Sequence, residues 1–234
     1  MKIRTVVLVI SVFSLLASSA TAQNDEILAR LKEFKISEER LSSNIKEVDA
    51  VHAYKLTSLT GSKEGNVESI AEYNPLQKIG KRWTLLTVNG AAPDKSDIKQ
   101  FNKQHNPKNK NISGKIDPAS YEIERDDKKF LVVKFRYIKE SLPSKFRFLG
   151  DCDARVYCKK DIMEMSYAEF TNFRQTKVKM FNVKELLVEM YYTYDEEAKA
   201  YIHEEARLDM TALIFGQEQE VEIINYYSDY KVVK

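Results

Sequence analysis

The chain has 234 residues, of which 43% are hydrophobic, and its 37 basic residues nearly balance its 35 acidic ones. This composition excludes a disordered chain, and seven Gly with five Pro exclude a collagen-like or low-complexity one. The balanced charge gives no electrostatic reason for nucleic acid or an anionic membrane surface as the main partner, and we expect no nucleic acid.

The first 22 residues are typical of a secretory signal peptide. Two basic residues precede an apolar run from Val6 to Leu16, and Ala20 and Ala22 fit a cleavage site directly after Ala22. The apolar run spans only about 16 Å as a helix, which is too short for a hydrocarbon core of roughly 30 Å. We therefore expect an exported, periplasmic protein with a single mature domain, residues 23–234, and no transmembrane segment.

Three later segments favour helices. In Asp25 to Phe34, apolar residues recur every three or four positions, which predicts a helix with one buried stripe. Glu38 to Val51 repeats this pattern less regularly, and Pro93 opens a helix-compatible run that reaches Phe101. Asn106 to Pro118 is polar and lacks apolar periodicity, so it predicts a loop.

Most of the remaining chain is typical of β-strands. The first candidates are Val51 to Leu59, Asn66 to Tyr73 and Arg82 to Val88, and the last of these stops at Asn89-Gly90, a dipeptide suited to positive φ. Later candidates are joined by short polar connections, which predicts an antiparallel meander. They are Lys129 to Ile138, Phe146 to Tyr157, Ile162 to Phe170, Val178 to Tyr194, Lys199 to Phe215 and Glu220 to Val233.

Alternation of residue type predicts a sheet with one dry face and one wet face. Between Lys199 and Phe215 the even positions are mostly apolar, while His203, Glu205, Arg207 and Asp209 alternate with them. A helical interpretation of Lys184 to Leu213 stays open, because that segment is rich in Glu, Ala, Leu and Met. The fold class that we expect is mainly β (α+β).

The sequence lacks the motifs of common enzyme classes. It contains no nucleophile elbow, phosphate-binding loop or dinucleotide fingerprint, and His52, His105 and His203 are not spaced as metal ligands. We predict a protein that is not an enzyme, with no catalytic residues, no metal site and no cofactor.

The two cysteines, Cys152 and Cys158, leave two interpretations open. Export would permit a disulfide between them. In one straight strand, however, they would stand roughly 20 Å apart, whereas a bridge needs Cα atoms within about 7 Å. A bridge therefore requires a bend, which the Gly150-Asp151 turn signal could supply.

Several segments resemble a group of exported bacterial proteins in the lipoprotein-carrier superfamily (LolA/LolB/RseB-like). They are Val67-Glu-Ser-Ile-Ala-Glu-Tyr-Asn-Pro75, Gly80-Lys-Arg-Trp-Thr-Leu-Leu-Thr-Val-Asn-Gly90, the helix at Pro93 and the closing Tyr-Ser-Asp-Tyr. The resemblance implies a strongly curved antiparallel sheet, an incomplete barrel, whose concave face is covered by short helices. It also implies an apolar cavity that takes acyl chains or engages envelope partners.

Two hypotheses of function follow. In the first, the half-barrel is a periplasmic binding protein for an acyl chain or another hydrophobic ligand. In the second, its core is filled by its own side chains, and the Tyr-rich strands recognise an envelope protein in an interaction or signalling role. The residues expected to line the cavity are Trp83, Leu85, Val133, Phe135, Val188, Met190, Leu208, Met210 and Ile214.

Overall fold

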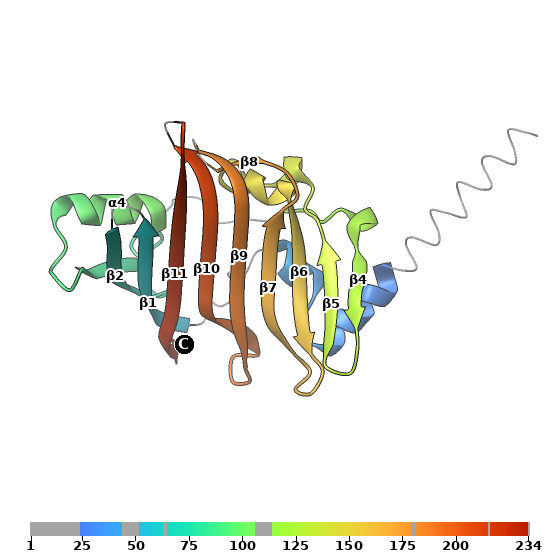
Figure 1. Ribbon diagram of the computed structural model, residues 1–234. Helices are drawn as coiled ribbons and strands as arrows, with labels where there is room; N and C mark the ends of the chain where they lie inside the picture. Colours follow the sequence, from blue (N-terminus) through green and yellow to red (C-terminus); the bar gives the residue numbers. More distant parts are fainter. Residues whose placement is uncertain are drawn as a thin grey trace, which may run out of the picture.

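The computed structural model describes residues 24–43, 52–62, 65–105, 114–178, 181–214 and 216–233. The described strands form one antiparallel, 11-stranded sheet with the order β3-β2-β1-β11-β10-β9-β7-β6-β5-β4, and β8 pairs with β9 (Figure 1). The strands are β1 (His52–Ser62), β2 (Gly65–Tyr73), β3 (Trp83–Val88), β4 (Glu122–Asp126), β5 (Phe130–Phe135), β6 (Cys152–Lys159), β7 (Glu164–Asn172), β8 (Thr176–Val178), β9 (Phe181–Asp195), β10 (Ala200–Ile214) and β11 (Gln217–Val232). The sheet is not closed into a barrel, since β3 and β4 are its two edges.

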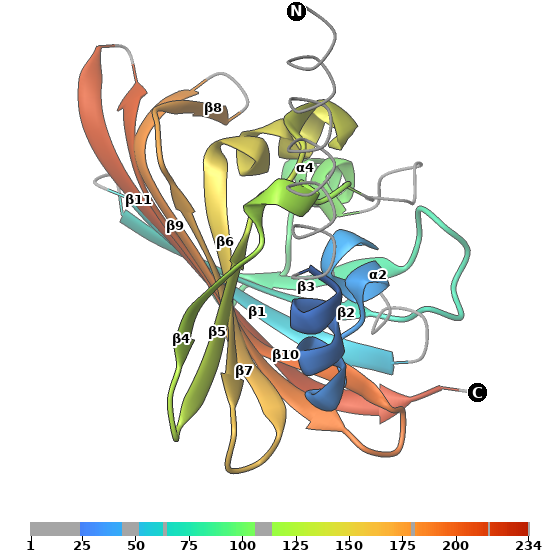
Figure 2. The same cartoon turned by 90° about the vertical axis from the view of Figure 1, so that its right-hand side faces the viewer.

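Short helices complete the fold, which confirms the expected fold class. They are the helical residues 24–33, α2 (Glu38–Ser43), α4 (Lys95–His105) and the 3-10 helices η1 (Pro118–Ser120), η2 (Lys139–Ser141) and η3 (Ser144–Asp151). Figure 2 shows the sheet strongly curved, with residues 24–33 and α2 lying against its concave side. None of the described helices combines the length and apolar character needed to cross a membrane.

The register of the strands explains why one face is apolar. One row of register partners from β5 to β11 consists of Phe135, Ala154, Phe170, Val188, Leu208 and Ile223. The next row consists of Lys134, Arg155, Glu169, Glu189, Arg207 and Ile224. Because successive side chains of a strand point to opposite faces, the first row lines the concave face and the second lies on the outer face.

Several predicted elements are confirmed at the residue level. The helix expected from Asp25 to Phe34 is present over 24–33. Strand β3 ends at Val88, and Asn89 and Gly90 follow with φ of 49° and 75°, as the dipeptide predicted. The stretch after Pro93 forms α4, whose Phe101 packs on Trp83 with 6.2 Å between ring centroids.

Other predictions need correction. The helical interpretation of Lys184 to Leu213 is wrong, because these residues belong to β9 and β10. The strand expected from Phe146 begins only at Cys152, since Pro143 starts a 3-10 turn in which the Phe146 amide donates to the Pro143 carbonyl at 2.8 Å.

Three predictions reach beyond the described residues. The second helix, expected from Glu38, ends at Ser43, and 44–51 lie outside the described residues. The same is true of 106–113 in the predicted polar loop and of the expected signal peptide, 1–22. Cleavage after Ala22 therefore stays a prediction.

Candidate functional site

Residues 24–43, here called the cover segment, close one end of the concave face. Ile27 and Leu31, on one stripe of the helix, are 1% and 0% exposed. Phe34, Ile36 and Leu41 continue the contact through the following turn and α2, and all are buried in the main hydrophobic core. The apolar stripe seen in the sequence therefore faces the sheet.

Two tyrosine hydroxyls fix the backbone of the cover segment to the sheet. Tyr201 on β10 donates a hydrogen bond of 2.7 Å to the Phe34 carbonyl oxygen, and its oxygen accepts one of 2.8 Å from the Met165 amide. Tyr137 donates at 2.6 Å to the Leu41 carbonyl oxygen. These bonds provide partners for backbone carbonyls near the ends of the two helices, where the last carbonyls have no partner within the helix itself.

Ion pairs surround the cover segment at its solvent-exposed rim. Arg30 contacts Asp126 at 2.7 Å, and Lys35 contacts Glu164 and Glu196 at 3.2 and 2.8 Å. The hydrogen bond from Arg30, with a second from Lys160, lowers the pKa of the Asp126 carboxyl. Such exposed pairs contribute little to stability, so the buried apolar side chains hold the segment in place.

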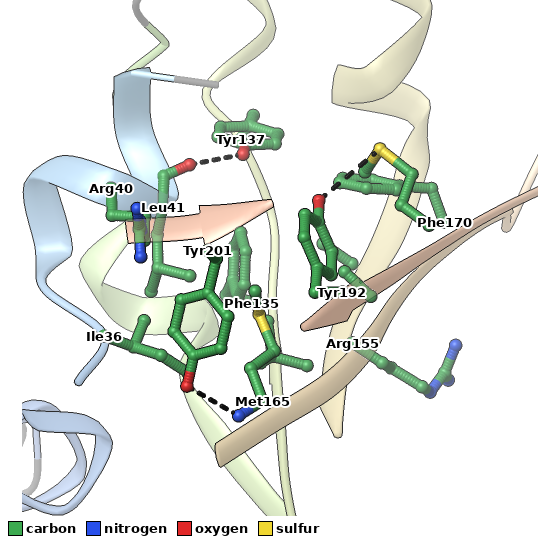
Figure 3. Close-up of a pocket in the computed structure, with 14 residues that line it drawn as sticks. Ile36, Arg40, Leu41, Phe135, Tyr137, Arg155, Met165, Phe170, Tyr192 and Tyr201 are labelled. Carbon is green, nitrogen blue, oxygen red and sulfur yellow. Dashed lines mark hydrogen bonds between the residues drawn. The ribbon is translucent and has the colours of Figure 1, made fainter. Parts of the chain in front are cut away.

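A small cavity lies between the cover segment and the sheet (Figure 3). Its volume is about 40 Å³, and it is lined by side chains of α2, of strands β5, β6, β7, β9 and β10, and of Ile36 and Tyr137, which lie just outside these elements. The lining residues are Ile36, Arg40, Leu41, Phe135, Tyr137, Ala154, Arg155, Val156, Met165, Ala168, Phe170, Met190, Tyr192 and Tyr201.

The polar groups around this cavity leave its interior apolar. Figure 3 shows Arg155 pointing away, and its guanidinium binds Glu124 on the outer face. Arg40 lies over the Tyr201 ring, with 4.9 Å from Cζ to the ring centroid. Burial raises the pKa of the Tyr137 and Tyr192 hydroxyls, so both stay neutral and present a ring to the cavity.

The volume limits what the cavity can hold as it stands. A cavity of about 150 Å³ is known to admit benzene, and a single water needs about 10 to 15 Å³. A space of about 40 Å³ is therefore too small for an acyl chain. A ligand of that length would have to displace the cover segment.

The structure distributes the nine expected cavity residues over the whole concave face. Phe135 and Met190 line the cavity. Val133 belongs to the surrounding core, and three others pack against that core from the middle strands, namely Val188, Leu208 and Met210. Ile214 is the last residue of β10, and its side chain lies outside the described part of the chain.

Trp83 and Leu85 lie at the other end of the same face, apart from the cavity. Trp83 is within 5.1 Å of Tyr73 and 5.5 Å of Tyr54, measured between ring centroids. Aromatic side chains then form an unbroken row back to the cavity, with consecutive centroids 4.7 to 5.8 Å apart. The row consists of Trp83, Tyr73, Tyr54, Tyr227, His203 and Tyr192.

Several residues that line the cavity were not among those expected from the sequence. Met165 and Ala168 lie on β7, and Tyr201 lies near the start of β10. Alternation alone assigns such residues to a face of the sheet but does not identify their neighbours. Ile36 and Leu41 lie beyond the regular helical stripe, in a turn and a short helix. Only the packing of the cover segment brings them to the sheet.

The two cysteines are free, which corrects the disulfide option. Cys152 and Cys158 both belong to β6 and are 1% and 0% exposed. The bend that a bridge would require lies before Cys152, in η3, rather than between the two residues. Burial raises the pKa of each thiol to about 12, so both stay protonated and unreactive at neutral pH.

In the part of the chain that the structure describes, no group of three or more His, Cys, Asp or Glu side chains could hold a metal ion. His52 is fully buried and its Nε2 lies 2.8 Å from the Asp195 carboxylate, a hydrogen-bond contact that joins the start of β1 to the end of β9.

No family model matches the chain, and no curated protein matches it. Among solved structures, the chain is similar to a LolA superfamily protein from Nitrosomonas europaea, with 10% identity over 90% of this chain and 93% of that one and a TM-score of 0.37. It is also similar to a domain described as an outer membrane lipoprotein-sorting protein from Vibrio parahaemolyticus, with 9% identity over 80% and 86% of the two chains and a TM-score of 0.36. The first of these belongs to the superfamily that the sequence segments resemble.

Proposed function

We propose that the protein is an exported, periplasmic binding protein that holds an acyl chain, or a hydrophobic segment of similar length, between the cover segment and the concave face of the sheet. The observation that carries this proposal is the apolar cavity of about 40 Å³ beneath a segment that is attached mainly by buried side chains. Export rests on the expected signal peptide, 1–22.

Energies decide which ligands could open such a site. Each fully buried aliphatic or aromatic side chain contributes about 1.5 to 3 kcal/mol, so the five of the cover segment contribute roughly 10 kcal/mol. A ligand gains about 0.8 kcal/mol for each methylene that it buries, so a chain of about 14 methylenes gains a similar amount. A small apolar molecule gains too little, and the site therefore favours long chains.

The expected lining residues fit this larger, opened site. With the cover segment in place, Val188, Leu208 and Met210 are only half-buried. They continue the apolar face of the sheet away from the cavity. A ligand chain that extends from Met190 along β9 and β10 would cover them.

A second candidate function is favoured by the small volume itself. Only about 40 Å³ is empty beneath the cover segment, so this part of the concave face is largely filled by the protein's own side chains. A self-filled core is what an envelope interaction protein requires if it recognises its partner through the outer strands.

Uptake of a fluorescent fatty acid, together with mass spectrometry of lipid extracted from the native protein, separates the two functions. Ala168 lines the cavity and is 6% exposed, so Ala168→Leu fills the empty space. Ala53→Leu, at a half-buried position of β1 that does not line the cavity, is the control. We expect Ala168→Leu to reduce uptake at least tenfold and Ala53→Leu to leave it unchanged. No uptake by the unmodified protein, and no bound lipid, would overturn the proposal and favour the self-filled alternative.

A further inference from the structure

The connection between β2 and β3, residues 74–82, exposes large apolar side chains. Leu76 is 65% exposed and Ile79 is 46% exposed. Figure 2 shows this connection projecting from the sheet, on the same side as the cover segment. Large exposed apolar residues of this kind mark interaction sites when they occur together.

The connection is held in one conformation by its own hydrogen bonds. The Asn74 amide donates to the Arg82 carbonyl oxygen at 2.8 Å, and the Lys81 amide donates to the Lys78 carbonyl oxygen at 2.8 Å. The Arg82 side chain donates to the Gln77 carbonyl oxygen and to the Tyr73 hydroxyl, each at 3.3 Å. Leu76 and Ile79 are thus presented outward by an ordered backbone.

The charged residues of the connection itself are all basic. Lys78 and Lys81 are exposed beside them, and no acidic residue occurs between Tyr73 and Pro93. Over 73–105 there are six basic and two acidic residues, although the whole chain is nearly balanced. The basic residues are Lys78, Lys81, Arg82, Lys95, Lys99 and Lys103.

Helix α4 extends this basic end of the molecule. Its exposed Lys95, Lys99 and Lys103 are spaced by four residues and so share one stripe of the helix. The two acidic residues, Asp94 and Asp97, accept hydrogen bonds from each other's backbone amides at the start of the helix. Phe101 and His105 pack on Trp83, the residue that follows the connection, so helix and connection lie together.

We propose that this end of the protein docks on an anionic lipid bilayer. Leu76 and Ile79 insert among the acyl chains near the headgroups, while Lys78, Lys81 and the α4 lysines contact anionic headgroups. Apolar side chains flanked by lysines on an ordered projection are the combination that binds such interfaces, because each group reaches its preferred layer of the bilayer. Docking concerns a different part of the chain from the proposed ligand cavity and does not depend on it.

Co-sedimentation of the full mature chain with vesicles tests the docking. We expect binding to vesicles of phosphatidylcholine containing one third phosphatidylglycerol, weaker binding at high salt and little binding to pure phosphatidylcholine. Lys78→Gln with Lys81→Gln should lower the partition coefficient about fivefold for each lysine. Leu76→Ser with Ile79→Ser should lower it on the order of tenfold.

A matched control uses another exposed apolar pair, at a different turn. Ile162 and Met163, between β6 and β7, are 54% and 38% exposed. Ile162→Ser with Met163→Ser should leave vesicle binding unchanged. Absence of binding by the unmodified protein at low salt, or an equal loss in this control, would overturn the docking. Fatty-acid uptake, measured on the same variants, should stay normal, so failure of docking and failure of ligand binding can be told apart.

Discussion

The hydroxyl of Tyr201 joins the cover segment to the sheet, because it donates to the Phe34 carbonyl oxygen at 2.7 Å while accepting from the Met165 amide at 2.8 Å. One buried oxygen thus bridges two backbone groups that lie 131 positions apart in the chain, residues 34 and 165. Removing it leaves both groups without this partner.

Tyr201→Phe should therefore loosen the cover segment. Leaving buried polar groups unsatisfied costs about 1 to 3 kcal/mol. We expect a lower free energy of unfolding and faster amide hydrogen exchange over 24–43 than over β6 and β7. Tyr194→Phe is the control, since Tyr194 contacts the Tyr201 ring at 5.0 Å but its hydroxyl makes no hydrogen bond in the described structure. Equal protection of residues 24–43 in both variants would contradict this role of Tyr201.

Asp151 should make stability fall in acid. This carboxylate is buried and accepts from Lys139, Thr176 and Arg174, so it joins η2 and β8 to the start of β6. Burial by itself raises the pKa of Asp151, but these three partners outweigh it and the pKa is lowered. A carboxyl whose pKa is lower in the folded state than in the unfolded state stabilises the fold above the unfolded pKa of about 3.9. This stabilisation is lost as the pH falls below that value toward the lowered pKa.

The corresponding measurement is urea unfolding at several pH values below neutral. We expect the free energy of unfolding to drop between about pH 5 and pH 3, and to drop less in Asp151→Asn, which has no carboxyl to protonate. Parallel pH profiles for the two proteins would show that Asp151 does not supply the acid sensitivity.

Gly150 should not tolerate a side chain. A Cβ at this position would lie 2.6 Å from the Lys139 Cα, because η2 and η3 approach closely there. Gly150→Ala should destabilise the protein by about 1 to 3 kcal/mol through the backbone shift that it forces. Gly61→Ala, whose nearest contact would be the Asn66 side chain at 3.3 Å, should cost less. Thermal unfolding of both variants checks whether Gly150→Ala is the more destabilising of the two.

Cys152 and Cys158 should be unreactive in the folded protein. Their thiols are buried and have pKa values raised to about 12, so the reactive thiolate is scarce at pH 8. Iodoacetamide should label neither residue in the native protein and both after unfolding without a reducing agent. Failure to label the unfolded protein would reveal a disulfide.

Local patterns were sufficient where neighbouring residues decide the structure. The spacing of Ile27 and Leu31 identified the helix of the cover segment, and Asn89-Gly90 marked the end of β3, since both depend on backbone preferences within a few residues. The start of β6 was missed because Pro143 promotes a 3-10 turn in a segment whose composition otherwise suits a strand.

The candidate cavity could be predicted only in part. Of the nine expected residues, Phe135 and Met190 line the cavity, whereas Trp83 lies in the aromatic row at the other end of the face. Alternation assigns a side chain to a face but not to a place along the sheet. That place depends on strand order, and the return of β11 to pair with β1 joins segments about 170 residues apart through contacts that no local pattern encodes.

The sequence by itself determined the mainly β character and the sidedness of the strands, because these follow from composition and periodicity, and the leader at 1–22 stays a prediction. Only the tertiary structure decided that the two thiols stay apart, that the cavity is as small as about 40 Å³ and that Leu76 and Ile79 face solvent. The reason is physical. Burial, cavity volume and exposure depend on packing between segments that are distant in the sequence. Many residues contribute to the free energy of that packing, so no single residue or local pattern predicts it.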